Sequence, residues 1–86
     1  MNEKEALRQM LSNLIEDNTI PKNIRIRIEE VSEKMKEQQD MPTLLSMMTY
    51  SLEDIVNDVN LPMHARTTLW NILSEIEMLK EKHRKK

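Results

Sequence analysis

The 86-residue chain contains no glycine, no cysteine and no phenylalanine. The phosphate loops of P-loop and Rossmann proteins need glycine, because the backbone there adopts positive φ or closely approaches the phosphate. The lack of glycine therefore excludes both kinds of nucleotide site. Without cysteine the chain can form no disulfide, thiolate nucleophile or Cys-ligated zinc site, and it fits a reducing cytoplasm.

The chain also lacks long apolar runs and a strong excess of either charge. No apolar stretch approaches the roughly 18 residues of a membrane span, so we expect no membrane segment. The opening stretch, MNEKEALRQM, is charged from Glu3 onwards, which argues against a signal peptide. The net charge of -2 makes nucleic-acid binding by the whole domain unfavourable.

What the chain does have is apolar residues at helical spacing. With 38% hydrophobic and 33% charged residues, the core must come from well-placed stripes. Intervals of three or four residues, as one helix face requires, predict helices over about 3–17, 21–38, 42–58 and 62–83. The stripes are Leu7, Leu11, Leu14; Ile24, Ile28, Val31, Met35; Leu44, Leu45, Met48, Leu52, Ile55, Val56; and Ala65, Leu69, Ile72, Leu73, Ile76, Leu79.

The chain matches itself at an offset of 41 residues, most clearly where DNTIPKNIR (17–25) aligns with DVNLPMHAR (58–66). A period near 40–47 residues is typical of the paired helices of HEAT and armadillo repeats. We therefore predict one all-α domain, 1–86, in which four helices form two HEAT-like hairpins. Unit one covers 1–41, unit two covers 42–82, and a basic tail covers 80–86.

The repeated motif is interpreted as a corner between two helices. Proline lacks an N–H and is tolerated at the first helical position, while the residue before it is held extended and can turn inward. The aspartates are expected to accept hydrogen bonds from corner N–H groups or from the arginines. The six corner residues are Asp17, Pro21, Arg25, Asp58, Pro62 and Arg66.

A closer resemblance is carried by NDVNLPMHARTTLWNILSEIE, residues 57–77, together with DNTIPKNIR. These segments resemble the small archaeal proteins of uncharacterised protein family 0147, and the likeness covers nearly the whole chain. The resemblance implies a small, helical, cytoplasmic archaeal protein. It implies no activity and carries over no catalytic residue.

Side chains that could do chemistry lack the spacing that chemistry needs. His64 and His83 are 19 residues apart, and the chain contains no Glu-x-x-His or His-x-x-x-His pair. Glu53, Asp54 and Asp58 could hold a cation or act as acid and base, but a solvated polar face is the favoured interpretation, because no His or Lys base lies beside them in the sequence. We expect no enzyme, metal or cofactor; a hydrolase or metal protein using this acidic face is the weakest hypothesis.

Four apolar residues lie outside or beside the stripes, namely Ile26, Met47, Met63 and Trp70. Most of the eight methionines are expected to fill the core in place of phenylalanine. Trp70 matches Glu29 in the repeat, so it packs between the hairpins, forms an interface or lines a ligand pocket. Repeat arrays generally need three or more units and this chain has two, which favours a homodimer or another protein partner.

The leading hypothesis is a cytoplasmic, non-enzymatic protein-interaction or self-association module. The alternative is an RNA- or ribosome-associated accessory protein that uses the basic tail KEKHRKK, residues 80–86. The same cations also complement the dipole of the last helix, and no aromatic residue is interleaved among them for stacking on bases. Nucleic acid is therefore the less favoured partner.

Overall fold

The computed structural model describes residues 2–84, in which there are four α-helices and no strand. The expectation of an all-α chain with four helices is confirmed, and every helix end lies within two residues of its expected position. The helices are α1 (Glu3–Ile15), α2 (Lys22–Glu37), α3 (Met41–Val56) and α4 (Met63–Lys82). Over the described part of the chain, none of them is both long and apolar enough to cross a membrane.

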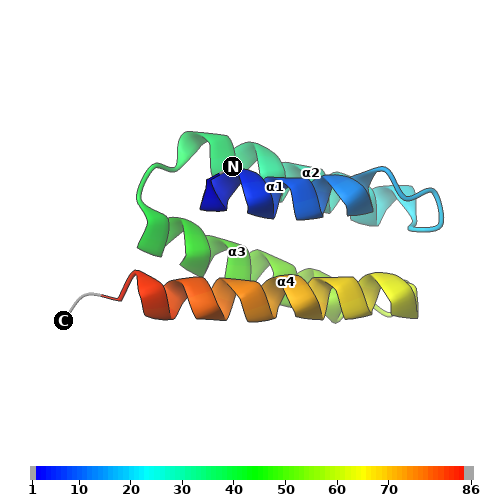
Figure 1. Cartoon of the computed structure of the whole chain (residues 1–86). Coiled ribbons are helices and arrows are strands. Elements are labelled where there is room, and N and C mark those ends of the chain that lie inside the picture. Colours follow the sequence, from blue (N-terminus) through cyan, green and yellow to red (C-terminus); the bar gives the residue numbers. More distant parts are fainter. Residues whose placement is uncertain (1, 85–86) are drawn as a thin grey trace.

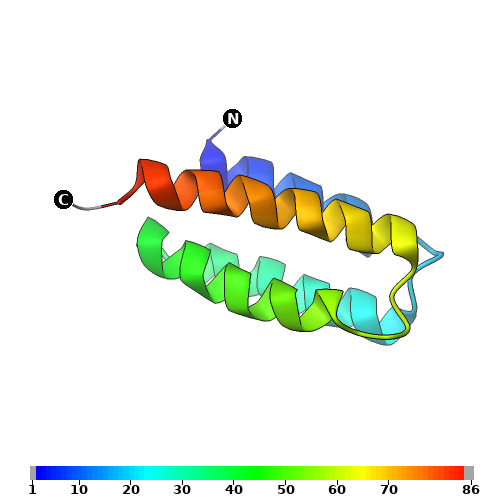
Figure 2. The ribbon, with the colours of Figure 1, turned by 90° about the horizontal axis from the view of Figure 1, so that it is seen from below.

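The four helices form an elongated bundle of 41 × 20 × 20 Å in which successive helices run in opposite directions (Figure 1). Helix α1 packs on α2 and α3 on α4, and the two hairpins meet through α2 with α3 and α1 with α4 (Figure 2). The helices that the repeat makes equivalent therefore lie diagonally across the bundle. A HEAT-like array would stack equivalent helices on one another. That arrangement is not confirmed, because the two units close their apolar faces against each other.

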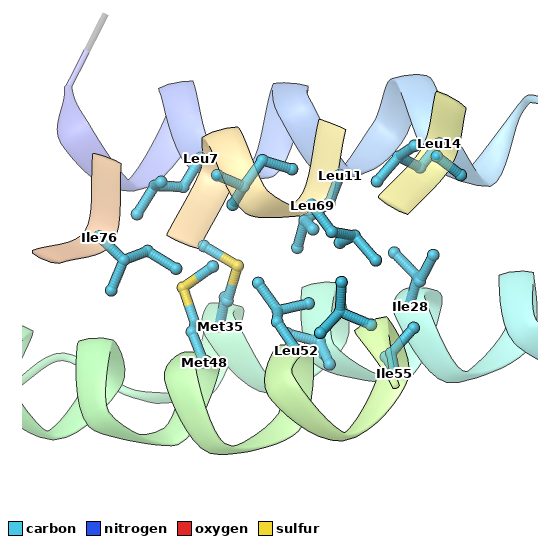
Figure 3. Packing of buried hydrophobic residues seen from close by; sticks show 14 of the residues in the cluster. Leu7, Leu11, Leu14, Ile28, Met35, Met48, Leu52, Ile55, Leu69 and Ile76 are labelled. Carbon is cyan, nitrogen blue, oxygen red and sulfur yellow. The ribbon is translucent and has the colours of Figure 1, made fainter. Parts of the chain in front are cut away.

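The core contains the stripes that the sequence predicted. Every residue of these stripes is buried except Leu73 and Leu79, which are partly buried against the same cluster. Figure 3 shows side chains from all four helices meeting in this core, with Met35 and Met48 near its middle. Both methionines are fully buried, so the flexible thioether fills space that an aromatic ring would fill elsewhere.

An asparagine or a proline stands at the start of three of the helices, and the prolines lie one position outside the helix. The side chain of Asn2 accepts the Glu5 N–H at 2.7 Å, which caps α1. Pro21 and Pro62 precede α2 and α4 as N-caps, one position earlier than expected, because their ψ angles of 141° and 149° are extended. Each proline carbonyl still accepts the N–H of the arginine four residues on, so both begin a helix as expected.

The two corners share the hydrogen bonds of the turn that follows each aspartate. Asp17 Oδ1 accepts the N–H of Thr19 at 2.9 Å, and Asp58 Oδ1 accepts the N–H of Asn60 at 2.8 Å. The aspartates thus accept hydrogen bonds from corner N–H groups, as expected. The residues before the prolines turn inward and are buried, namely Ile20 and Leu61. The similarity of the two segments thus extends to the structure of the turn.

Candidate functional site

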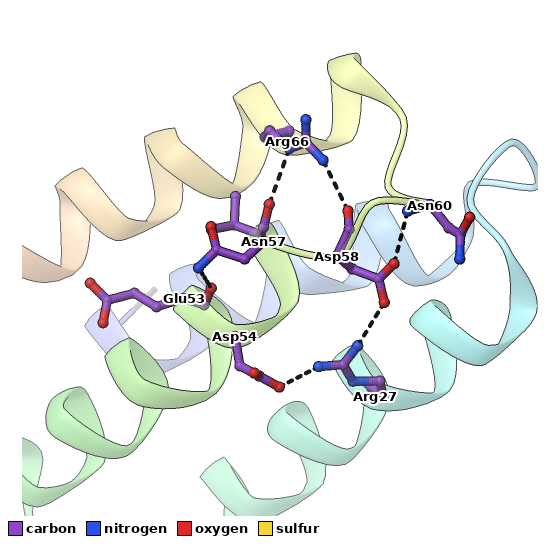
Figure 4. Close-up of polar contacts among 8 residues, drawn as sticks. Arg27, Glu53, Asp54, Asn57, Asp58, Asn60 and Arg66 are labelled. Atoms are coloured by element: carbon purple, nitrogen blue, oxygen red, sulfur yellow. Dashed lines mark hydrogen bonds and ion pairs between the residues drawn. The ribbon is translucent and has the colours of Figure 1, made fainter.

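The corner arginines bind main-chain carbonyls. Arg66 donates from Nε to the Val56 carbonyl at 3.0 Å and from Nη2 to the Asp58 carbonyl at 2.9 Å (Figure 4). Arg25 donates from Nε to the Ile20 carbonyl at 3.0 Å. Val56 is the last residue of α3, and the last carbonyls of a helix have no intrahelical donor, so Arg66 stabilises the end of α3. Arg25 instead binds a carbonyl of the connection that precedes α2. Of the two alternatives for the corner aspartates, the structure thus has the corner N–H groups as donors and not Arg25 or Arg66.

Each corner carboxylate instead binds a side chain from the other unit. Arg27 of α2 donates to Asp58 Oδ2 at 3.1 Å and also binds Asp54 (Figure 4). His64 of α4 lies with Nε2 2.9 Å from Asp17 Oδ2. The two hairpins are thus joined at their corner end by the two ion pairs of Arg27 and by one histidine–carboxylate contact. Of the three acidic residues considered in the sequence, Asp54 on α3 and Asp58 in the corner after α3 are paired with Arg27.

Thr19, His64 and Asp17 form a cluster that resembles a catalytic triad only in composition. In a triad the hydroxyl and the carboxylate bind opposite nitrogens of the imidazole. Here Nε2 of His64 lies 2.9 Å from both Thr19 Oγ1 and Asp17 Oδ2. The Thr19 hydroxyl also donates to Asp17 Oδ1 at 2.6 Å, so its proton is directed to the carboxylate. Hydrogen bonds from Thr19 and His64 lower the pKa of Asp17 to about 2.

The second histidine joins the same two parts of the molecule at the opposite end of the bundle. Nε2 of His83 and Nζ of Lys82 both lie 2.6 Å from the carboxylate of Glu3 at the start of α1. Hydrogen bonds from Lys82 and His83 lower the pKa of Glu3. The two histidines therefore fasten the two ends of α4 to unit one.

The basic tail is largely matched by glutamates. Within residues 80–84 three cations are paired: Lys80 with Glu77, Lys82 with Glu3, and Arg84 with Glu81. The remaining tail lysines, Lys85 and Lys86, lie outside the described residues. In residues 2–84 no group of three or more His, Asp or Glu side chains is placed to hold a metal ion.

The clearest surface feature is apolar. Val59, Met63 and Trp70 are 91%, 63% and 51% exposed, and they are called the Trp70 surface here. Val59 and Trp70 line one hollow together with Val56, Asn57 and Arg66, where α3 ends beside α4. Met63 lies two turns before Trp70 on the same side of α4.

The repeat supplies an internal comparison for this surface. At the offset of 41 residues, the Trp70 surface corresponds to three polar residues of unit one: Asn18, Lys22 and Glu29. The corners fold alike in both units, so the fold does not require apolar side chains at these positions. Trp70 lies on the outside of the bundle, beside α3, and does not enter the packing between the hairpins.

The other two suspected interface residues lie apart from this surface. Ile26 is 48% exposed on α2, and Met47 is partly buried against the core. Sequence reasoning missed three exposed apolar residues: Tyr50, Val59 and Met78. Val59 could have been found by comparison with Asn18, whereas Met78 lies close to the core stripe and needs the helix orientation to be recognised.

The fold and its contacts define a small all-α protein, a closed bundle of two similar hairpins held together at both ends by polar contacts. A family described as "Uncharacterised protein family (UPF0147)" matches residues 2–79, and the chain belongs to this family. The resemblance carried by the two corner segments is thereby confirmed.

Several archaeal proteins of this family are similar over most of the chain. The UPF0147 protein of Methanothermobacter thermautotrophicus is 40% identical over 74 residues, 85% of this chain and 72% of the relative. That of Methanocaldococcus jannaschii is 39% identical over 72 residues, 83% and 77% of the two chains. That of Archaeoglobus fulgidus is 36% identical over 75 residues, 87% and 86% of the two chains. No solved structure matches the chain.

Proposed function

We propose that this protein is a non-enzymatic protein-interaction module that binds its partner through the Trp70 surface. The observation that carries the proposal is the replacement of Asn18, Lys22 and Glu29 of unit one by three exposed apolar residues in unit two. Exposed apolar area costs about 25 cal/mol per Å² relative to burial, so covering this surface stabilises a complex. Tryptophan is also enriched among the residues that dominate binding energy.

The polar clusters support a structural role and not a chemical one. The Asp17 carboxylate is occupied by Thr19 and His64, and the Asp58 carboxylate by Arg27. Each contact joins the two units or closes a corner. A binding module needs this rigidity, because a surface on a fixed scaffold loses less conformational entropy when it binds.

An RNA- or ribosome-associated role remains the alternative, and the tail gives it less support. Affinity for phosphate depends on cations that are free to release counterions. Lys80, Lys82 and Arg84 each lie against a glutamate. Binding to RNA would therefore have to break these pairs or rely on the residues beyond 84.

The test exchanges residues between the units. A variant with Val59→Asn, Met63→Lys and Trp70→Glu carries the unit-one residues, and its fold is checked by circular dichroism. The tagged protein and the variant are incubated with an archaeal lysate, and bound proteins, including untagged copies of this chain, are quantified by mass spectrometry. We expect the variant not to bind the proteins that the unaltered protein captures.

The matched control makes the reverse exchange on the other unit, Ile26→Thr, which replaces an exposed residue of α2 by its unit-two counterpart. This control should capture the same proteins as the unaltered chain. Equal capture by all three proteins would refute the Trp70 surface as the binding site.

A further inference from the structure

The outward side of α4 carries a row of exposed uncharged residues between Met63 and Met78. Six exposed residues form it, and they are called the α4 outer face: Met63, Thr67, Trp70, Asn71, Ser74 and Met78. Their counterparts on α2, at the 41-residue offset, are Lys22, Ile26, Glu29, Glu30, Glu33 and Glu37. Five of these six are charged. Depletion of charge together with an aromatic residue is the composition that marks the centre of a protein interface.

The α4 outer face is also symmetric about its own midpoint. Met63 and Met78 are equally distant from the point between Trp70 and Asn71, and so are Thr67 and Ser74. Read in either direction, the face presents a methionine, a small hydroxyl residue, the central pair, a small hydroxyl residue and a methionine. Such a pattern is complementary to a reversed copy of itself.

We propose that the α4 outer face binds the same face of a second copy of this chain, antiparallel, with a two-fold axis between Trp70 and Asn71. This inference rests on the proposed function and names its partner. In this register Met63 lies against the partner's Met78, and Thr67 against the partner's Ser74. The two Trp70 side chains are related by the axis and meet each other across it.

Charge explains why a second copy fits better than an unrelated surface. A charged residue close to a two-fold axis faces its own like charge, so a self-complementary contact requires a neutral centre. The residues from Thr67 to Ser74 provide one. Outside this neutral centre, His64 and Arg66 precede it on α4, and Glu75 and Glu77 follow it, before the basic last turn with Lys80 and Lys82. The antiparallel register brings His64 of each copy towards the partner's Glu77 and Arg66 towards the partner's Glu75.

The small hydroxyl residues explain how the helices can approach. Packed helices lie about 8–10 Å apart, and short side chains favour the lower end of that range. Thr67 and Ser74 flank the centre, while the longer methionines lie at the ends of the face. A second copy can therefore cover the apolar side chains that the bundle leaves in water.

The first experiment measures the molar mass by light scattering coupled to size exclusion at protein concentrations from about 1 µM to about 1 mM. This range covers the dissociation constants of weak dimers. The full chain should change from the monomer mass to the dimer mass. Trp70→Glu, which introduces the unit-one residue at the axis, should raise the dimer dissociation constant by at least about tenfold. Ile26→Thr should leave it unchanged.

The second experiment determines the register of the two helices by disulfide cross-linking. The chain has no native cysteine, so only the introduced cysteines can form a disulfide. Thr67→Cys and Ser74→Cys are prepared separately and oxidised alone and as a mixture. Their Cα atoms face each other across the antiparallel contact, whereas two copies of position 67 are about 10 Å apart along the helix axis. Because a disulfide needs Cα atoms within about 7 Å, only the mixture should cross-link efficiently. A mixture of Ile26→Cys and Glu33→Cys, the matched positions on α2, should not.

The outcomes separate this inference from the function on which it rests. A monomer mass at every concentration, together with protein capture that the unit-one exchange abolishes, would overturn the second copy as partner and leave the interaction function standing. A monomer mass at every concentration, together with protein capture that the unit-one exchange leaves unchanged, would overturn both the dimer and the proposed interaction function. A dimer in which Thr67→Cys cross-links efficiently to itself would overturn the antiparallel register.

Discussion

Two isoleucines on α2, two residues apart, should respond very differently to the same truncation. Ile28 is 0% exposed and Ile26 is 48% exposed. Figure 3 shows Ile28 pointing into the cluster formed by all four helices. Replacing either residue by alanine removes the same three carbon atoms, so any difference in stability reports the environment and not the chemistry of the change.

The expected magnitudes follow from burial. Removing three buried carbons forfeits about 2.4 kcal/mol of transfer free energy. The cavity left behind adds to this, giving a loss of about 2–5 kcal/mol for Ile28→Ala. Ile26 keeps about half of its surface in water, and alanine favours the helix slightly, so Ile26→Ala should cost less than about 1 kcal/mol.

The assay is urea unfolding followed by circular dichroism at 25 °C, with the free energy of unfolding extrapolated to zero denaturant. A domain of this size is typically stable by only about 4–13 kcal/mol, so the Ile28→Ala loss is a large fraction of the whole. Similar losses at both positions would show that the face assigned to the core is wrong. A large loss at Ile26 alone would reverse the assignment and place an interface on α2.

Three other contacts give testable expectations. Arg66→Ala should lower the free energy of unfolding by about 1–2 kcal/mol, since it removes the hydrogen bonds to the Val56 and Asp58 carbonyls. Unchanged urea unfolding would contradict this. The Asp17 carboxyl should titrate near pH 2 in an NMR titration, and Thr19→Val should raise its pKa towards the ordinary 3.8, because the hydroxyl hydrogen bond is the largest cause of the shift. A depressed pKa means that the stabilisation from Asp17 is present above about pH 4 and is lost as the pH falls towards 2; an unchanged pKa in the variant would refute the hydrogen-bond explanation. Arg27→Gln should weaken the contact with Asp58 and increase amide hydrogen exchange at the corner 57–61, and identical protection would show that the ion pair does not hold the hairpins.

Local features of the fold could be predicted because their causes are local. Proline restricts its own φ and the residue before it, and an aspartate two residues before a free N–H closes a turn. The corner at Asp17 and its copy at Asp58 therefore follow from nine-residue stretches. The core stripes follow equally well, since one helix face must be apolar whatever it packs against.

The packing of the hairpins could not be predicted in the same way. The 41-residue offset fits both stacked repeats and a closed pair, because both bury one apolar stripe per helix. Which one forms depends on contacts between units, such as Arg27 with Asp58 and His64 with Asp17. These partners are 31 and 47 residues apart in the sequence, and no sequence motif indicates that they pair. For the same reason the sequence left open whether the corner aspartates bind N–H groups or the arginines.

The α4 outer face could be recognised only after the helix orientation was known. The offset alone pairs Trp70 with Glu29, and it marks that position as unusual. It does not show that Thr67, Asn71 and Ser74 share the exposed side with Trp70. That side is defined by burial of the opposite one, which the structure provides.

The most direct test of the central claim is the fluorescence of Trp70, the only tryptophan in the chain, measured from nanomolar to high micromolar concentration. If the α4 outer face binds a second copy about an axis beside Trp70, the indole leaves water as the dimer forms. The emission maximum should then move to shorter wavelength over the same concentration range in which the mass doubles. An emission spectrum that stays constant while the mass doubles would place the dimer contact elsewhere and contradict the account.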